Sequence, residues 1–199
     1  MKRILLVMLA TIASVSAFAN HILDFDVNSG NTGINGNQTV GWQFDVNTQI
    51  IVTHLSWYDH GQDGIDEHEV GLWDTGGNLL VSAVLGSGTS EALDGIWRTV
   101  DVADTILTVG SGYIVGGYNG ATSTDVLKAN VSQTVASEIT FVDATFSNFG
   151  ATLDRPTIFS VASSGFYGPS FQYQAVPEPA TMVALGLGAA ALLRRRRKA

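Results

Sequence analysis

The sequence of 199 residues contains no cysteine, and its basic residues are almost confined to the two ends. The absence of cysteine excludes disulfides, thiolate metal sites and a cysteine nucleophile. Between residues 20 and 176, three Lys or Arg stand against 17 Asp or Glu, a formal charge of −14. Because nucleic-acid binding requires clustered basic side chains, we expect no nucleic-acid partner.

Residues 1–19 have the pattern of a secretory signal peptide. A basic start is followed by the apolar stretch 4–13 and by the small-x-small motif Ala17-Phe18-Ala19. The alternative, a membrane anchor, requires an apolar run of about 20 residues, which is longer than this stretch. We therefore predict cleavage by signal peptidase after Ala19 and a mature chain that begins at Asn20.

Three features follow one another at the C-terminus. Pro177-Glu178-Pro179 come first, the 14-residue segment from Ala180 to Leu193 follows and is an uninterrupted apolar run from Met182, and the basic cluster 194–198 comes last. This segment would measure about 21 Å as a helix, against a hydrocarbon core of about 30 Å, so it spans only if flanking side chains snorkel. The basic cluster orients the tail toward the cytoplasm and leaves the preceding domain outside. We expect a short transmembrane helix here.

This tripartite tail resembles the PEP-CTERM sorting signal of Gram-negative bacteria. The resemblance implies recognition by an exosortase, processing at or near Pro177, Glu178 and Pro179, and transient attachment to the inner membrane. It also implies delivery to the cell surface or to an extracellular polysaccharide matrix. An ordinary C-terminal anchor is the alternative, and it needs a longer apolar run. The expected organisation is a signal peptide (1–19), a central domain (20–176) and a sorting signal (177–199).

The central domain is predicted to be all-β, a single jelly-roll-like β-sandwich. Segments rich in Val, Ile, Thr and aromatic residues alternate with Gly, Asn and Asp clusters, and no window keeps the spacing of an amphipathic helix. The segment 39–46 alternates apolar and polar side chains, as a half-buried strand does. The candidate strands are 39–46, 50–58, 68–74, 79–85, 96–102, 113–118, 139–146 and 170–173.

Two segments of the central domain lack a clear pattern. Residues 24–38 are rich in Asn, Gln and Gly, which predicts an irregular lead-in with at most one short strand. Residues 121–137 fit either a loop or a short helix capped near Thr124. We expect this second segment to be a long connection across one end of the sandwich.

An acidic segment, 58–69, holds the densest group of polar residues. Asp59, Asp63 and Asp66 lie around two glycines and could supply oxygen ligands for Ca²⁺, although their spacing is not that of an EF-hand. The alternative is an ordinary solvated turn. An acid/base pair for glycoside hydrolysis is a further alternative, but no second carboxylate-rich segment faces this one. A loop is therefore favoured over an active site.

Three histidines raise a second metal hypothesis. His54, His60 and His68 suit zinc or copper chemically, yet their spacing matches no helix-based metal motif. Because His54 lies within a predicted strand, packing is the alternative for this residue.

All four tryptophans fall in predicted strands. Trp42 shares the core-facing pattern of its segment, whereas Trp73 alternates with Val70 and Leu72 and is expected on the other face. An exposed Trp73 could stack on sugar rings, so it is a candidate ligand-binding residue. Burial in a β-core is the alternative.

A second resemblance concerns the central domain itself. The segments 58–64, 68–74, 77–80, 112–113 and 165–173 are similar to an uncharacterised β-sandwich domain common in exported PEP-CTERM proteins. That family implies no established activity. We expect an exported, non-enzymatic sandwich with a structural or adhesive role at the cell surface or in an extracellular matrix. A carbohydrate-binding module with a Ca²⁺-stabilised loop and a surface hydrolase are the alternatives.

Overall fold

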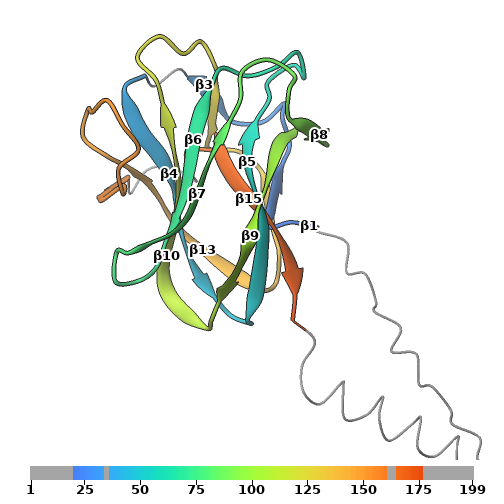
Figure 1. Ribbon diagram of the computed structural model, residues 1–199, viewed down its shortest axis with the longest axis vertical. Coiled ribbons are helices and arrows are strands. Elements are labelled where there is room, and N and C mark those ends of the chain that lie inside the picture. The colour runs from blue at the N-terminus through green and yellow to red at the C-terminus, as the bar shows by residue number, and fades with distance from the viewer. Residues whose placement is uncertain (1–19, 34–35, 161–164, 177–199) are drawn as a thin grey trace, which may run out of the picture.

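The structure, a computed structural model, describes residues 20–33, 36–160 and 165–176 (Figure 1). The predicted signal peptide and the predicted C-terminal helix lie outside these residues. In the described part of the chain, every regular element is a β-strand. No helix in that part is long and apolar enough to cross a membrane. The all-β prediction for the central domain is confirmed.

Two large antiparallel sheets and two small ones make up the described domain. The β5 sheet has the order β1 (Asn20–His21), β15 (Pro169–Ala175), β5 (Ile50–Tyr58), β9 (Trp97–Leu107) and β8 (Ala92–Asp94). The β4 sheet has the order β14 (Ile158–Ser160), β13 (Ile139–Phe146), β4 (Gln38–Val46), β10 (Gly110–Asn119), β6 (His68–Trp73) and β7 (Leu79–Leu85). The small sheets pair β11 (Leu127–Ala129) with β3 (Asn31–Gly33) and β12 (Gln133–Val135) with β2 (Leu23–Phe25).

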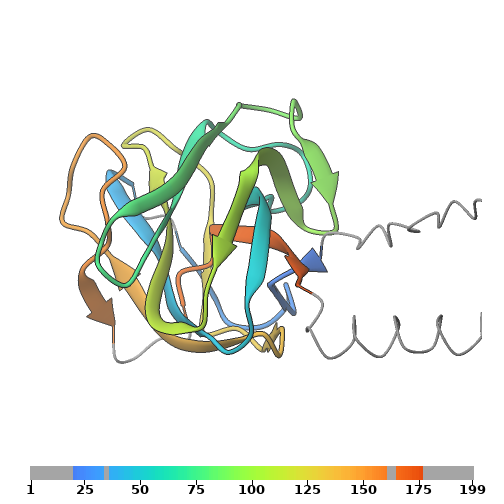
Figure 2. The same ribbon diagram turned by 60° about the horizontal axis from the view of Figure 1, so that its bottom comes forward.

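Figure 2 shows the two large sheets facing each other, and the buried aromatic side chains of the core pack between them. Trp42 of β4 stacks on Phe171 of β15 with ring centroids 6.0 Å apart, and Phe44 lies 5.3 Å from the same ring. All three side chains are fully buried. The core-facing pattern predicted for the segment 39–46 is thus confirmed, and burial of such rings supplies most of the driving force for folding.

All eight predicted strands are present, with ends that differ by a few residues, but the ambiguous segments were misjudged. The lead-in 24–38 contributes to β2 and contains β3, which is more strand than expected. The segment 121–137 contains β11 and β12, so the short-helix alternative is wrong. These strands form because the two segments pair with each other, β11 with β3 and β12 with β2. Such long-range pairing overrides local propensity.

Glycines on the outer face of the β4 sheet make room for a covering segment. Gly41, Gly116 and Gly71 are direct neighbours on three adjacent strands. A Cβ atom at Gly116 would lie 2.9 Å from Cγ of Pro156, and one at Gly71 would lie 3.0 Å from Cδ2 of Leu153. The connection between β13 and β14 therefore packs directly on this sheet, where side chains larger than hydrogen would push it away.

The last strand carries the chain from one end of the sandwich to the other. Pro169, at the start of β15, pairs with Trp57 near the end of β5, and Ala175 pairs with Ile50 at the start of β5. Seven strand residues span about 20 Å. The chain therefore leaves the domain at the end opposite the loop that joins β5 to β6 (Figure 1).

Candidate functional site

The loop after β5 is held in place by a buried ion pair. Asp59, which directly follows β5, is 1 % exposed, and Nε of Arg98 in β9 donates to its Oδ2 at 2.8 Å. The backbone N–H of Gly64 donates to both carboxylate oxygens, at 3.3 and 3.2 Å. Arg98 also donates through Nη1 to the carbonyl of Glu91 at 3.0 Å. These donors engage both oxygens of Asp59, so this carboxylate fixes the loop.

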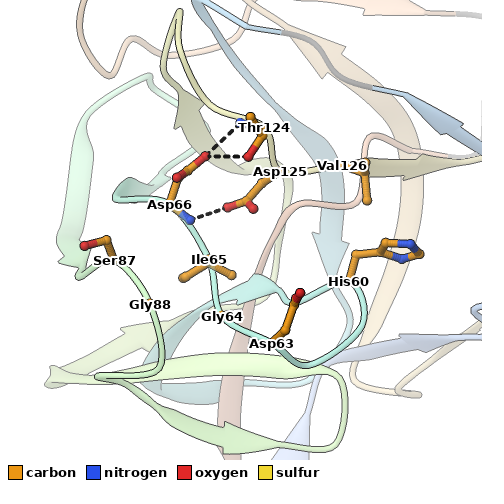
Figure 3. A pocket seen from close by; sticks show the side chains of 10 residues that line it. All are labelled: His60, Asp63, Gly64, Ile65, Asp66, Ser87, Gly88, Thr124, Asp125 and Val126. Atoms are coloured by element: carbon orange, nitrogen blue, oxygen red, sulfur yellow. Dashed lines mark hydrogen bonds between the residues drawn. The ribbon is translucent and has the colours of Figure 1, made fainter.

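The second half of the same loop is tied to the segment that precedes β11. The N–H of Thr124 donates to Oδ2 of Asp66 at 2.7 Å, and the N–H of Asp66 donates to Oδ2 of Asp125 at 2.6 Å (Figure 3). The bond from the Thr124 N–H is the main reason that the pKa of Asp66 lies below its usual value. Two loops that are distant in sequence are thereby joined, because a carboxylate of each loop accepts a backbone N–H of the other.

A buried histidine completes this network. His68 at the start of β6 is fully buried; its Nε2 lies 2.7 Å from Oδ2 of Asp125 and its Nδ1 lies 3.1 Å from the carbonyl oxygen of Tyr118. Each ring nitrogen of His68 therefore has an oxygen partner, one in the segment before β11 and one in β10. The ring stacks on Trp57 with centroids 3.7 Å apart and planes 11° apart.

A pocket of about 470 Å³ opens between these loops (Figure 3). Its lining comes from His60 and 63–66 after β5, Ser87 and Gly88 after β7, and 124–126 before β11. Carboxylates, hydroxyls and one imidazole predominate, and Ile65 and Val126 are the apolar members. In Figure 3 the side chain of Asp63 stands apart from the hydrogen bonds that join Asp66 to Thr124 and Asp125. A lining of this kind suits a neutral or basic polar ligand better than an anion, because carboxylates repel negative charge.

The predicted calcium ligands do not come together as one ligand set. Asp59 is buried against Arg98, whereas Asp63 and Asp66 line the pocket and Asp66 accepts from the N–H of Thr124. Within the described ranges there is no group of three or more His, Asp or Glu that could hold a metal ion. The guanidinium already neutralises the Asp59 carboxylate, which removes the charge that would attract Ca²⁺ to it.

The three histidines contact different partners and share no ligand-binding position. Nδ1 of His54 contacts Oγ1 of Thr53 at 3.0 Å, and Nδ1 of His60 contacts the Tyr58 hydroxyl at 3.0 Å. His68 faces Asp125 instead. Each imidazole thus serves its own local contact, and the zinc or copper hypothesis finds no shared site in the described residues.

Comparison with known protein families gives two matches. Residues 27–168 match the family described as Domain of unknown function (DUF4082). The chain belongs to this family. Residues 175–198 match the PEP-CTERM protein-sorting motif. No curated protein and no solved structure matches the chain.

The sorting motif confirms the predicted PEP-CTERM tail behind the DUF4082 domain. It begins at Ala175, the last residue of β15. The motif marks the chain as an exported protein that is sorted by an exosortase, with a transient C-terminal membrane anchor before processing. The predicted processing residues Ala19 and Pro177-Glu178-Pro179 lie outside the described residues.

Trp73 of the DUF4082 domain does not form an exposed surface for sugar stacking, although the alternation of its strand allowed one. Its side chain lies on the outer face of the β4 sheet, as expected, but it is only 5 % exposed. Its ring packs over Gly71 together with Leu79 and Leu153. The connection between β13 and β14 covers that face, so the exposed surface needed for sugar stacking is absent in this structure, and binding by Trp73 stays a prediction.

The sequence did not predict four residues of the site: Arg98, Ser87, Thr124 and Asp125. Asp125 lies 57 positions from His68 and Arg98 lies 39 positions from Asp59, so no local pattern links them. One signal was available for Arg98. It is one of only three basic residues between 20 and 176, and it lies in a predicted strand where a carboxylate partner is needed.

Proposed function

We propose that this DUF4082 protein is a non-enzymatic jelly roll with a structural or adhesive role at the cell surface or in an extracellular matrix. The strand order supports the jelly roll. If β1, β4, β5, β6, β7, β9, β10 and β15 are counted as the first to eighth strands, the first, eighth, third and sixth adjoin in one sheet. The second, seventh, fourth and fifth adjoin in the other. Two interlocked Greek keys give this order.

The path of β15 through the domain is the main observation that supports the proposal. This strand starts beside the loops that form the pocket and ends at Ala175, where the sorting motif begins. A domain held by its C-terminus therefore presents the pocket about 20 Å from the point of attachment, facing away from it. A surface protein that contacts a matrix component or a neighbouring cell needs this orientation.

The charge of the domain narrows the class of adhesive partner. A formal charge of −14 over residues 20–176 keeps the domain soluble and repels anionic surfaces. Neutral or basic matrix components are therefore the partners that fit. The acidic lining of the pocket has the same preference.

Carbohydrate binding is the second candidate, and the polar pocket favours it. Hydroxyls and carboxylates there can bond to sugar hydroxyls, although the buried Trp73 supplies no stacking surface. A hydrolase is the third candidate, since Asp66 and Asp125 reach the pocket from separate loops. Against it, the neighbouring imidazole of His68 is fully buried and contacts an oxygen atom at each nitrogen, so it does not reach a substrate in the pocket.

Cells that produce the full chain test the proposal against cells that lack it and cells whose chain lacks 177–199. We expect the full chain to increase surface adhesion or matrix cohesion and the shortened chain to lose that effect. A double change, His60→Ala with Asp63→Ala, alters the pocket without touching the Asp59 ion pair. Loss of adhesion in this variant, with sorting retained, supports recognition through the pocket. Equal adhesion with and without the gene contradicts the proposal, and release of sugars from the matrix favours the hydrolase.

A further inference from the structure

The edge strands of the two large sheets differ in how they are protected. β1, β8 and β14 have two or three residues each, too short to offer a long row of free backbone groups. The part of β9 beyond β8 carries Asp101 and Asp104 and contains a register shift, and charges and bulges both discourage pairing. β7 is longer than those short edges and carries no charge, and its one register shift against β6 is confined to Leu80, so Val81–Leu85 keep regular pairing.

β7 is a long, uncharged edge. It has seven residues, and β6 is its only paired neighbour in the described part of the chain. No charged residue occurs between Asp74 and Glu91, although the domain carries 17 carboxylates. Leu80 and Val84 on its outer face are 38 % and 51 % exposed. An apolar, uncharged edge of this length is a template for another strand.

The sequence of β7 is nearly the same in both directions about Ser82. Leu79 corresponds to Leu85, Leu80 to Val84, and Val81 to Ala83. Val81 and Ala83 pack against the core, so Leu80, Ser82 and Val84 share the outer face. An antiparallel copy of this strand, turned about a two-fold axis at Ser82, would set Leu80 opposite Val84 twice.

We propose that β7 pairs with β7 of a second copy of this chain. The pairing joins the two β4 sheets into one continuous sheet and covers Leu80 and Val84 of both copies. The contact is isologous, so it closes at a dimer. Like charges oppose the approach of two acidic domains elsewhere, and β7 is the uncharged stretch where this repulsion is smallest. The inference deepens the proposed structural role and rests on it.

The absence of cysteine allows a direct test by cross-linking. In the variant Ser82→Cys, the two new side chains face each other across the axis with Cβ atoms about 5 Å apart, close to disulfide distance. In the matched variant Val84→Cys, the two thiols are displaced by four strand residues, about 13 Å. Both variants are made in the full chain, exported from a host that has an exosortase, and examined on non-reducing gels.

We expect Ser82→Cys to form a disulfide-linked dimer under mild oxidation and Val84→Cys to remain monomeric. In sedimentation of the wild type, a dimer should form with rising concentration and should be strengthened by added salt, which screens the acidic charge. Val84→Lys should be monomeric, whereas Phe149→Lys, at a 75 % exposed site elsewhere, should behave as the wild type.

Two results would overturn the pairing: a monomeric wild type at all concentrations, or equal cross-linking of both cysteine variants. Either result leaves adhesion by the single chain untouched, since adhesion is measured on cells. Conversely, a specific Ser82→Cys dimer in cells that show no change in adhesion contradicts the proposed function and keeps the dimer.

Discussion

Asn20 in β1 pairs with Tyr173 in β15, so the two ends of the described domain lie side by side at one edge of the β5 sheet. The contact continues along the chain, since the N–H of Ile22 donates to the carbonyl of Phe171 at 3.2 Å. The side chain of Ile22 is fully buried. Asn20 is the residue that follows the predicted signal-peptidase site, and Ala175 begins the sorting motif. Both predicted maturation cuts therefore flank the same pair of strands.

The intact mass of the mature protein should correspond to a chain that starts at Asn20 and ends at or near residues 177–179. Earlier cleavage at the C-terminus would remove part of β15, which pairs with both β1 and β5. Mass spectrometry of protein recovered from the producing cells measures both cuts at once. A mass that includes residues 1–19, or that ends inside β15, contradicts this prediction.

Replacement of Arg98 by Ala should destabilise the domain strongly. The change leaves the carboxylate of Asp59 buried without its partner, which costs about 3–5 kcal/mol in comparable pairs. Urea denaturation measures the loss of unfolding free energy. The double variant Asp59→Asn with Arg98→Ala should recover part of this loss, because no unpaired charge then remains.

A matched change in the same loop provides the control. Asp63→Asn alters an exposed carboxylate that lines the pocket, and such surface changes cost within about 0.5 kcal/mol. If Arg98→Ala is no more destabilising than Asp63→Asn, the ion pair does not hold this loop.

Removal of divalent cations should leave the melting temperature of the protein unchanged. A cation that binds only the folded state raises apparent stability, and a chelator would reverse that gain. The Arg98 guanidinium already occupies the Asp59 carboxylate, so the acidic loop lacks the ligand set that Ca²⁺ requires. Melting curves with and without chelator decide the question. A fall in melting temperature that added Ca²⁺ restores would show that the loop binds metal.

The strands of the domain were accessible from the sequence because each carries its own signal. In the segment 39–46, the alternation of Val40, Trp42 and Phe44 identifies both the strand and its buried face. β2, β3, β11 and β12 have three residues each, too few for a periodic signal. They exist through pairing with each other, which only the folded chain brings about.

The candidate site was accessible only in part. The acidic loop was located correctly, but the fate of its carboxylates depends on groups that are distant in sequence, Arg98 for Asp59 and Thr124 for Asp66. The outward direction of Trp73 was predicted correctly as well. Its burial depends on the connection between β13 and β14, which packs over Gly71 and Gly116. No periodic pattern in the sequence of this connection predicts that packing.

The stability of the domain should fall as the pH falls below about 6.5, and His21 should be one cause. Burial lowers the pKa of His21 below 6.5, although Asp94 at 3.2 Å from Nε2 partly opposes the effect. The unfolded chain therefore takes up the proton first, so the stabilisation is present above pH 6.5 and is lost as the pH falls toward the folded-state pKa. Melting temperatures between pH 8 and pH 5.5 measure the loss.

The variant His21→Gln should lack this part of the decline, because glutamine does not titrate. His60→Gln, a change at an exposed site, is the matched control and should keep the decline of the wild type. Parallel pH profiles of the wild type and His21→Gln would exclude His21 as a source.

Truncation of Trp73 should affect stability and leave any sugar binding intact. The ring is 5 % exposed and packs with Leu79 and Leu153 over Gly71, so Trp73→Ala removes a buried aromatic side chain, a loss of about 3–5 kcal/mol. Trp73→Phe keeps most of the packing and gives a folded protein for a pull-down on matrix polysaccharide. Phe149→Ala, at a 75 % exposed site, should change stability by no more than about 0.5 kcal/mol. If Trp73→Phe folds normally but no longer binds a polysaccharide that the wild type retains, the ring contacts sugar after all, and the segment that covers it must open.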